Sequence, residues 1–160
     1  MKPTRICFVC LGNIVRSPLA ENLFVHTANQ EGVGHEFDVD SAGTSSWHVG
    51  ERPDPRMRRV ATSRGFRYDG RARQFKRSDF EKFDLIIAMD LENICALERL
   101  AQSEEHKTKI HLLREYDPYG EPNASVPDPY YGGHFGFEET YTIVERSIKG
   151  LLKELIKRKE

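Results

Sequence analysis

The chain has 160 residues and a formal net charge of −1, with 24 Lys and Arg side chains against 25 Asp and Glu side chains. A balanced charge argues against a nucleic-acid-binding protein, which usually carries a large basic excess. No apolar run approaches the roughly 20 residues that a membrane helix needs. The three cysteines are an odd number, so a disulfide framework is not expected. We therefore predict one cytoplasmic domain over residues 1–160, without a cofactor or a metal site.

Apolar patterns predict strands and helices in alternation. In chain order we expect a strand at 5–10, a helix from Ser17 to a stop at Gly32, a strand at 37–42, a helix at 57–64, a helical turn at 78–83, a strand at 85–89, a helix at 90–101, a strand at 109–113 and a helix at 137–158. Loops are expected at 43–56 and 116–135. Loops as long as the second are often functional in compact domains.

Strands that alternate with helices indicate an α/β fold, a parallel sheet covered by helices on both faces. Functional side chains in such folds lie beyond the carboxyl ends of the strands. The first predicted strand ends at Cys10, so its thiol stands where a functional side chain is expected.

The loop between the first strand and the first helix has the composition of a phosphate-binding loop with a nucleophile. It consists of Cys10, Leu11, Gly12, Asn13, Ile14, Val15, Arg16 and Ser17. A tight turn at Gly12 lets successive backbone N–H groups point at one oxyanion, and the positive end of the following helix faces the same point. Arg16 adds a planar fork that can hold two phosphate oxygens.

The same positive field favours the thiolate of Cys10, which makes Cys10 the candidate nucleophile. Ser17 either donates a hydrogen bond to the sulfur or only caps the helix. Asn13 is expected to hold the loop in a left-handed turn. The alternative interpretation is a buried cysteine at a strand end beside a surface arginine. The strand before the loop, the glycine inside it and the Ser-Pro helix start after it argue against that alternative.

These residues resemble the signature of the low-molecular-weight protein tyrosine phosphatases, and the resemblance continues along the chain. It includes DSAGT at 40–44, WHVGERPDP at 47–55, ARQ at 72–74 and DPYYG at 128–132. The resemblance implies a doubly wound, four-stranded parallel sheet of the phosphotyrosine phosphatase I type, no metal, and a two-step reaction through a phosphocysteine. Val15 stands where many members carry a second cysteine, so a protective disulfide with Cys10 is not expected. Gly70 stands where some members have His.

The reaction needs a carboxylic acid beside the leaving group, because a phenolate leaves slowly unless it is protonated. Asp128 is the best candidate, since Pro127 and Pro129 restrict the backbone on both sides. The alternative is a turn-forming Asp-Pro pair, of which the chain has others at 54–55 and 117–118. The resemblance implies that Asp128 is the general acid of the first step and the general base of the second.

Aromatic residues of the predicted loops are candidates for the walls of a phosphotyrosine cleft, because a phenyl ring stacks on flat apolar faces. They are Trp47, Tyr130 and Tyr131. Leu11 and Ile14 are expected to line the floor of the cleft. Core packing is the alternative for each of these side chains. A further group of basic residues either attracts anionic substrates or forms a solvated surface: Arg52, Arg56, Arg71, Arg73 and Lys76.

We expect phosphotyrosine-containing proteins as partners, inorganic phosphate as product, and a monomer, with weak self-association through the aromatic rim as the alternative. Two other activities share this loop. An arsenate reductase needs two further thiols in a mobile segment, where only Cys95 is available. Phosphoarginine phosphatases tend to carry Thr where Ile14 stands. A phosphate-binding module without turnover is the non-enzymatic alternative, which the presence of Cys10, Arg16 and Asp128 does not favour.

Overall fold

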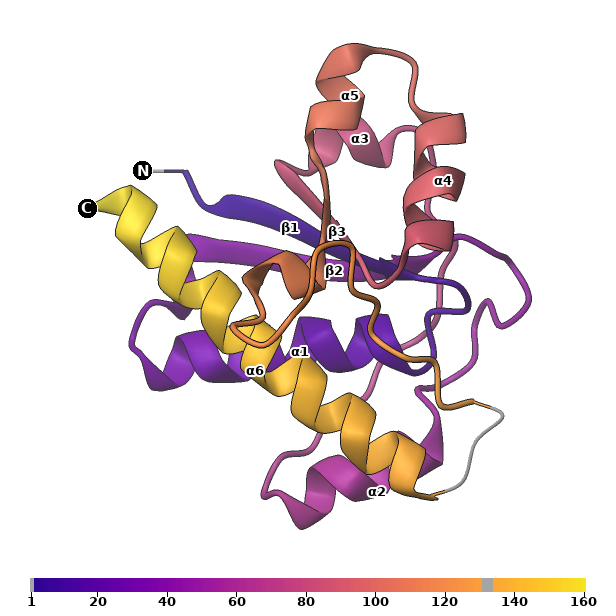
Figure 1. The fold of residues 1–160 in the computed structure, drawn as a ribbon, viewed down its shortest axis with the longest axis vertical. Helices are drawn as coiled ribbons and strands as arrows, with labels where there is room; N and C mark the ends of the chain where they lie inside the picture. The colour runs from indigo at the N-terminus through magenta and orange to yellow at the C-terminus, as the bar shows by residue number, and fades with distance from the viewer. Residues whose placement is uncertain (1, 131–133) are drawn as a thin grey trace.

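The protein is a four-stranded parallel sheet with helices on both faces (Figure 1). The computed structural model describes residues 2–130 and 134–160. The strands are β1 (Thr4–Cys10), β2 (Phe37–Gly43), β3 (Leu85–Ala88) and β4 (Ile110–Leu112), in the spatial order β2-β1-β3-β4. All three pairings are parallel. The predicted α/β fold with a doubly wound parallel sheet is therefore confirmed.

Two layers of helices enclose the sheet (Figure 1). One face is covered by α1 (Arg16–Gln30), α2 (Pro55–Ser63) and α6 (His134–Lys159), and the other by α3 (Asp79–Lys82), α4 (Leu91–Leu100) and α5 (Glu104–Thr108). The short turns η1 (Gly34–Glu36) and η2 (Leu113–Tyr116) precede β2 and follow β4. Side chains of β1 alternate between two cores, with Ile6 and Phe8 in one and Cys7 and Val9 in the other. This double burial explains the continuous apolar sequence of β1.

The carboxyl end of β1 is the topological switch point of the sheet. β1 lies between β2 and β3, so the chain winds away from it in opposite directions. Ligands of open α/β sheets bind in the crevice that such a reversal creates. Cys10 is the last residue of β1 and therefore stands at the crevice.

The interpretation of Ser17 as the helix cap is wrong. Helix α1 begins at Arg16, and Val15 is the residue that precedes it. Val15 already has φ −116° and ψ −75°, so the last turn of the phosphate loop runs directly into the helix. The Ser17 hydroxyl lies 3.0 Å from the Cys10 sulfur instead.

Three other helices differ from the prediction. Helix α2 begins at Pro55 because the Asp54 carboxylate accepts a hydrogen bond from the Arg56 N–H at 2.8 Å. Helix α5 was not predicted; it is five residues long, and its signal is Ser103, whose hydroxyl accepts from the His106 N–H. Helix α6 begins at His134, three residues before the expected start, and shortens the second loop. A helix as short as α5 lacks a full apolar period, so the sequence pattern does not reveal it.

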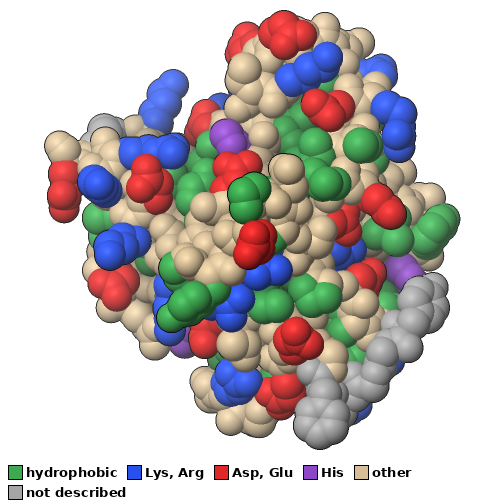
Figure 2. Space-filling view, in the orientation of Figure 1, with side chains coloured by type: hydrophobic (Ala, Val, Ile, Leu, Met, Phe, Trp, Pro, Cys, Tyr) green, Lys and Arg blue, Asp and Glu red, His purple; other side chains and the backbone are tan. Residues whose placement is uncertain are grey.

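Charge is dispersed over the face shown in Figure 2, where acidic and basic side chains are interspersed. This distribution accords with the nearly equal numbers of basic and acidic residues, 24 and 25. Among the helices in the described part of the chain, none is both long and apolar enough to cross a bilayer.

The buried hydroxyl of Tyr68 is expected to lower the stability of the core. Its ring is stacked on Phe66 and is 8% exposed, and its hydroxyl has no hydrogen-bond partner among residues 2–130 and 134–160. We expect Tyr68→Phe to raise the free energy of unfolding by about 1 kcal/mol, because the cost of burying an unpaired hydroxyl disappears. Urea unfolding measures the difference, with Tyr119→Phe, a change at a 79% exposed ring, as the neutral control. A clear loss of stability in Tyr68→Phe would show that the hydroxyl is bonded in solution.

Candidate active site

Cys10, the predicted nucleophile, is buried and its sulfur has two polar neighbours. The residue is 2% exposed, and the backbone N–H of Asn13 donates to its Sγ across 3.3 Å. The Ser17 hydroxyl lies 3.0 Å from the same sulfur, against 3.4 Å from the Ala42 carbonyl. Asn13 Nδ2 donates to the Ser17 oxygen, and the Ser17 hydroxyl has two acceptors within reach, the sulfur and the Ala42 carbonyl. Donors aimed at a sulfur stabilise its thiolate, the form that acts as nucleophile.

Asn13 holds the phosphate loop in shape. It has φ +56°, so the left-handed position of the loop is Asn13 and not the neighbouring Gly12. Its amide also donates to Ser41 Oγ at 2.9 Å and accepts from the Arg73 N–H at 3.0 Å. The loop is thus tied to β2 and to the segment after α2. Gly12 serves a different need, since a Cβ there would lie 3.0 Å from the ring of His48.

We expect Asn13→Ala to lower the free energy of unfolding by about 2–4 kcal/mol, because three hydrogen bonds are lost and Ala disfavours a positive φ. It should also weaken the binding of inorganic phosphate. Urea unfolding and competitive inhibition by phosphate measure the two effects. The matched control is Asn22→Ala, which removes one Asn hydrogen bond to the Pro18 carbonyl and leaves the loop untouched. Equal losses in the two variants would contradict the assigned function of Asn13.

Arg16 is the first residue of α1, and hydrogen bonds hold one nitrogen of its guanidinium, Nη1, in place. The residue is 3% exposed, and its Nη1 donates to Asp90 at 2.7 Å and to the Val126 carbonyl at 3.1 Å. Nη2 has a longer contact of 3.4 Å with Asp128. Burial acts to lower the pKa of Arg16, but the charges of Cys10, Asp90 and Asp128 outweigh it and raise the pKa. The guanidinium therefore stays charged, and its Nη2 edge is available to bind an anion such as phosphate in addition to Asp90.

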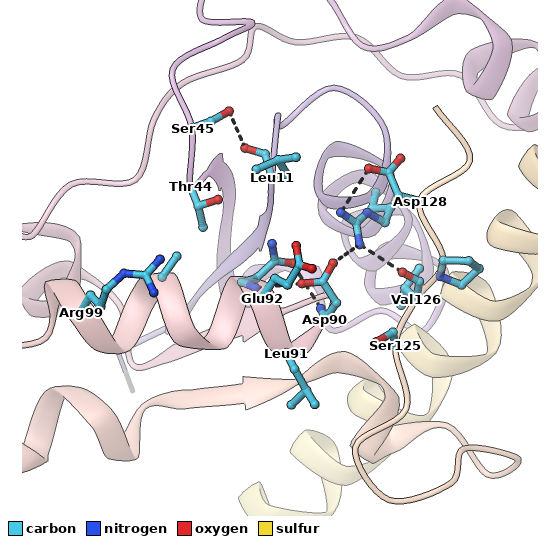
Figure 3. A pocket seen from close by; sticks show the side chains of 14 residues that line it. Leu11, Thr44, Ser45, Asp90, Leu91, Glu92, Arg99, Ser125, Val126 and Asp128 are labelled. Carbon is cyan, nitrogen blue, oxygen red and sulfur yellow. Dashed lines mark hydrogen bonds and ion pairs between the residues drawn. The ribbon is translucent and has the colours of Figure 1, made fainter. Parts of the chain in front are cut away.

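Asp128 lies across the crevice from the phosphate loop (Figure 3). Its Oδ1 accepts from the Tyr130 N–H at 3.0 Å, which leaves Oδ2 directed at Arg16. The preceding loop is pinned at two places: the Val126 N–H donates to the Met89 carbonyl at the end of β3, and Thr140 of α6 donates to the Pro127 carbonyl. The side chain is 37% exposed, so it can exchange a proton with a leaving group or with water.

The start of this loop is held in place by ion pairs of Asp117. The Asp117 carboxylate has no exposed surface and accepts hydrogen bonds from Arg114 and Arg146. Burial acts to raise the pKa of Asp117, but hydrogen bonds from Arg146, the Tyr119 backbone and Arg114 outweigh it and hold the pKa below its ordinary value. The buried cluster anchors the chain about ten residues before Asp128, which limits where the acid can move.

Comparison with known proteins identifies the family. Residues 5–160 match the family described as Low molecular weight phosphotyrosine protein phosphatase. The chain belongs to this family. A low molecular weight protein-tyrosine-phosphatase of Streptomyces coelicolor is 48% identical over 149 residues, which are 92% of this chain and 91% of that protein. The predicted resemblance is confirmed, and the chain is a protein-tyrosine-phosphatase.

Solved structures of related phosphatases agree with this fold. A protein tyrosine phosphatase from Entamoeba histolytica with Hepes in its active site matches with a TM-score of 0.91 and 38% identity over 98% of this chain and 99% of that one. The Drosophila arginine phosphatase matches with a TM-score of 0.86 and 33% identity over 97% of this chain and 98% of that one. Fold alone therefore does not separate tyrosine from arginine specificity.

The phosphatase cleft contains most of the predicted binding residues. Its lining consists of Cys10, Leu11, Gly12, Ile14, Val15, Arg16, Trp47, His48, Asp128 and Tyr130. Asn13 and Ser17 belong to the loop but are buried and do not line the cleft. Tyr131 lies outside the described residues. Trp47 is 71% exposed, which suits a rim and not a core position.

Two residues of this phosphatase site were missed. Asp90 was not named among the site residues. It caps α4 by accepting from the Asn93 N–H, and its second oxygen holds Arg16. The sequence signal was an acid directly after a strand of the parallel sheet. His48 follows Trp47 in a loop, and its ring packs at 5.7 Å from Tyr130. Its sequence signal is its place in the segment at 47–55 that resembles the family.

The predicted basic group does not act as one unit. Arg52 pairs with Asp69, Arg56 with Asp54, and Arg73 with Asp40 and Asp79. Across residues 2–130 and 134–160, no cluster of His, Cys, Asp and Glu side chains is arranged to hold a metal ion.

Proposed function

We propose that Cys10, Arg16 and Asp128 carry out the phosphatase reaction of this chain on phosphotyrosine. The observation that carries the proposal is the convergence of two groups on the Cys10 sulfur, the Asn13 N–H and the Ser17 hydroxyl, beside a buried arginine. Such a site supports a thiolate next to a bound dianion, because the donors and the guanidinium balance the negative charges.

The first step forms a phosphocysteine. The Cys10 thiolate attacks phosphorus, the bond from phosphorus to the tyrosine oxygen breaks, and Asp128 gives its proton to that oxygen. In the second step a water molecule attacks the phosphocysteine and Asp128 takes its proton. The sulfur–phosphorus bond breaks, and inorganic phosphate and the thiolate are released. Arg16 holds two phosphate oxygens through both steps.

The walls of the cleft favour a phenyl ring over a guanidinium. Ile14 is 7% exposed and presents an apolar surface beside the phosphate loop, and the rings of Trp47 and Tyr130 line the opening. An arsenate reductase relay is not favoured, because Cys7 is buried within β1 and Cys95 is exposed on α4. Neither thiol lines the cleft that contains Cys10.

Phosphate release from three peptides tests the proposal. They share one sequence and differ only in a central phosphotyrosine, phosphoserine or phosphoarginine. We expect rapid release from the phosphotyrosine peptide alone. Preference for phosphoarginine would overturn the interpretation of Ile14 and Trp47 and leave the mechanism standing. No release from any of the three, with Cys10 reduced and the protein folded, would contradict the proposed function.

The proposal also covers the substrates, the compartment and the oligomeric state of the protein. The substrates are phosphotyrosine-containing proteins, and residues 1–160 act as one catalytic domain. The protein works in the cytoplasm as a monomer, and all of the proposed chemistry is carried by side chains of this chain. Sedimentation at increasing concentration checks the monomer.

A further inference from the structure

A second pocket adjoins the catalytic cleft along α4 (Figure 3). Its volume is about 650 Å³, and it shares Leu11, Arg16 and Asp128 with the cleft. From there it follows α4 to Arg99, which lies at the opposite end of the pocket from Asp128 (Figure 3). A substrate whose phosphate is on Cys10 therefore has an open space beside it along α4.

A third pocket continues the second one beyond Arg99. Its volume is about 530 Å³, and it shares Thr44, Ala96 and Arg99 with the second pocket. Lys76 and Arg77 line its far side. The two pockets together form one channel, here called the α4 groove, that leads from the cleft to these cations.

The far end of the α4 groove is basic and not neutralised. Lys76, Arg77 and Arg99 are all exposed. Within the described ranges, none of them is paired with a carboxylate; the Arg77 guanidinium donates only to the Leu100 carbonyl, at 3.0 Å. The near end differs, because Asp90 is paired with Arg16 and Glu92 is exposed. Charge thus changes from acidic to basic along the groove, so an occupant needs its negative charge at the far end.

The length of α4 sets where that charge must be. Glu92 and Arg99 are seven residues apart on α4, which corresponds to about 10 Å along the helix axis. An extended peptide covers about 3.3 Å per residue. A peptide that enters the groove beside Glu92 therefore needs about three further residues for a carboxylate to reach Arg99.

We propose that the α4 groove binds the substrate segment next to phosphotyrosine and selects acidic side chains about three or four residues away. The inference rests on the proposed phosphatase function and adds a determinant of substrate choice to it. Exposed ion pairs contribute little each, but two or three together should change kcat/KM about threefold to tenfold, and more at low salt.

Matched peptides test the groove. Each carries phosphotyrosine with Glu, Gln or Lys at the third and fourth positions, on its amino-terminal or its carboxyl-terminal side. Native enzyme should prefer the Glu peptide of one side over its Gln partner by about threefold to tenfold in kcat/KM, and the Lys peptide should be poorest. Raising the salt concentration should reduce the difference.

The variant that decides the matter is Lys76→Glu with Arg99→Glu, because neither side chain has a hydrogen-bond partner within the described ranges. We expect the preference for Glu over Lys peptides to disappear or reverse. The control is Lys149→Glu with Lys153→Glu, which makes the same change in net charge at two exposed positions of α6. Hydrolysis of a small aryl phosphate, which has no flanking segment, should be the same in all of these proteins.

The outcomes separate the two proposals. Equal peptide preference in native enzyme and in the double variant would overturn the groove, as would a lack of any preference with aryl phosphate hydrolysis intact. Failure of native enzyme to hydrolyse even the aryl phosphate would contradict the phosphatase function instead.

Discussion

Cys10→Ser is expected to lower turnover of phosphotyrosine by at least about four orders of magnitude, the scale of nucleophile removal in covalent catalysis. A serine hydroxyl keeps its proton at neutral pH and is a far weaker nucleophile than a thiolate. The change exchanges one atom, so the donors from Asn13 and Ser17 and the guanidinium of Arg16 remain. Binding of a phosphotyrosine peptide should therefore persist.

Two measurements on Cys10→Ser separate catalysis from binding. Phosphate release gives turnover, and titration calorimetry with the peptide gives affinity. The matched control is Cys95→Ser, at the exposed thiol of α4, which should keep full activity. Substantial turnover by Cys10→Ser would exclude this sulfur as the nucleophile.

Asp128→Asn is expected to lower kcat by about 10²- to 10⁴-fold for phenyl phosphate, whose leaving group needs a proton. The loss in the bond-breaking step should be much smaller for an aryl phosphate with a stable anionic leaving group, since that group leaves without protonation. The amide keeps the size of the side chain and the acceptor for the Tyr130 N–H. The loop should therefore keep its place.

A series of aryl phosphates with graded leaving groups checks this prediction. The release of the phenol is followed in the first turnover, which isolates the first step. Asp69→Asn serves as the control, because Asp69 is an exposed carboxylate that pairs with Arg52. An equal loss for every leaving group would mean that Asp128 does not protonate the phenolate.

Local sequence was sufficient for the parts of this site that are built from neighbouring residues. The strand before Cys10 and the glycine and arginine after it predict both the turn and its anion-binding character. The alternation of strands and helices predicts the parallel sheet and hence the edge at which the site lies.

Contacts between distant segments could not be predicted in this way. Arg16 is held by Asp90, which lies 74 residues along the chain, and Asn13 accepts from the Arg73 N–H, 60 residues away. The position of Asp90 directly after a strand indicates the edge of the sheet at which the site lies. Its capping contact gives no local sign of which side chain its second oxygen binds. Ser17 was ambiguous for the same reason, because its hydroxyl suits a cap and a sulfur contact equally.

Trapping of the phosphoenzyme tests the central claim most directly. Asp128→Asn should be mixed with an aryl phosphate that has a stable leaving group, so that the first step is fast and the second, without its base, is slow. After an acid quench, mass spectrometry of the intact protein and of its peptides locates the phosphoryl group. We predict one phosphoryl group on Cys10, released on longer incubation and absent from the variant that also carries Cys10→Ser. A phosphoryl group on another residue, or steady hydrolysis with neither an initial burst of phenol nor a phosphoenzyme, would contradict the mechanism.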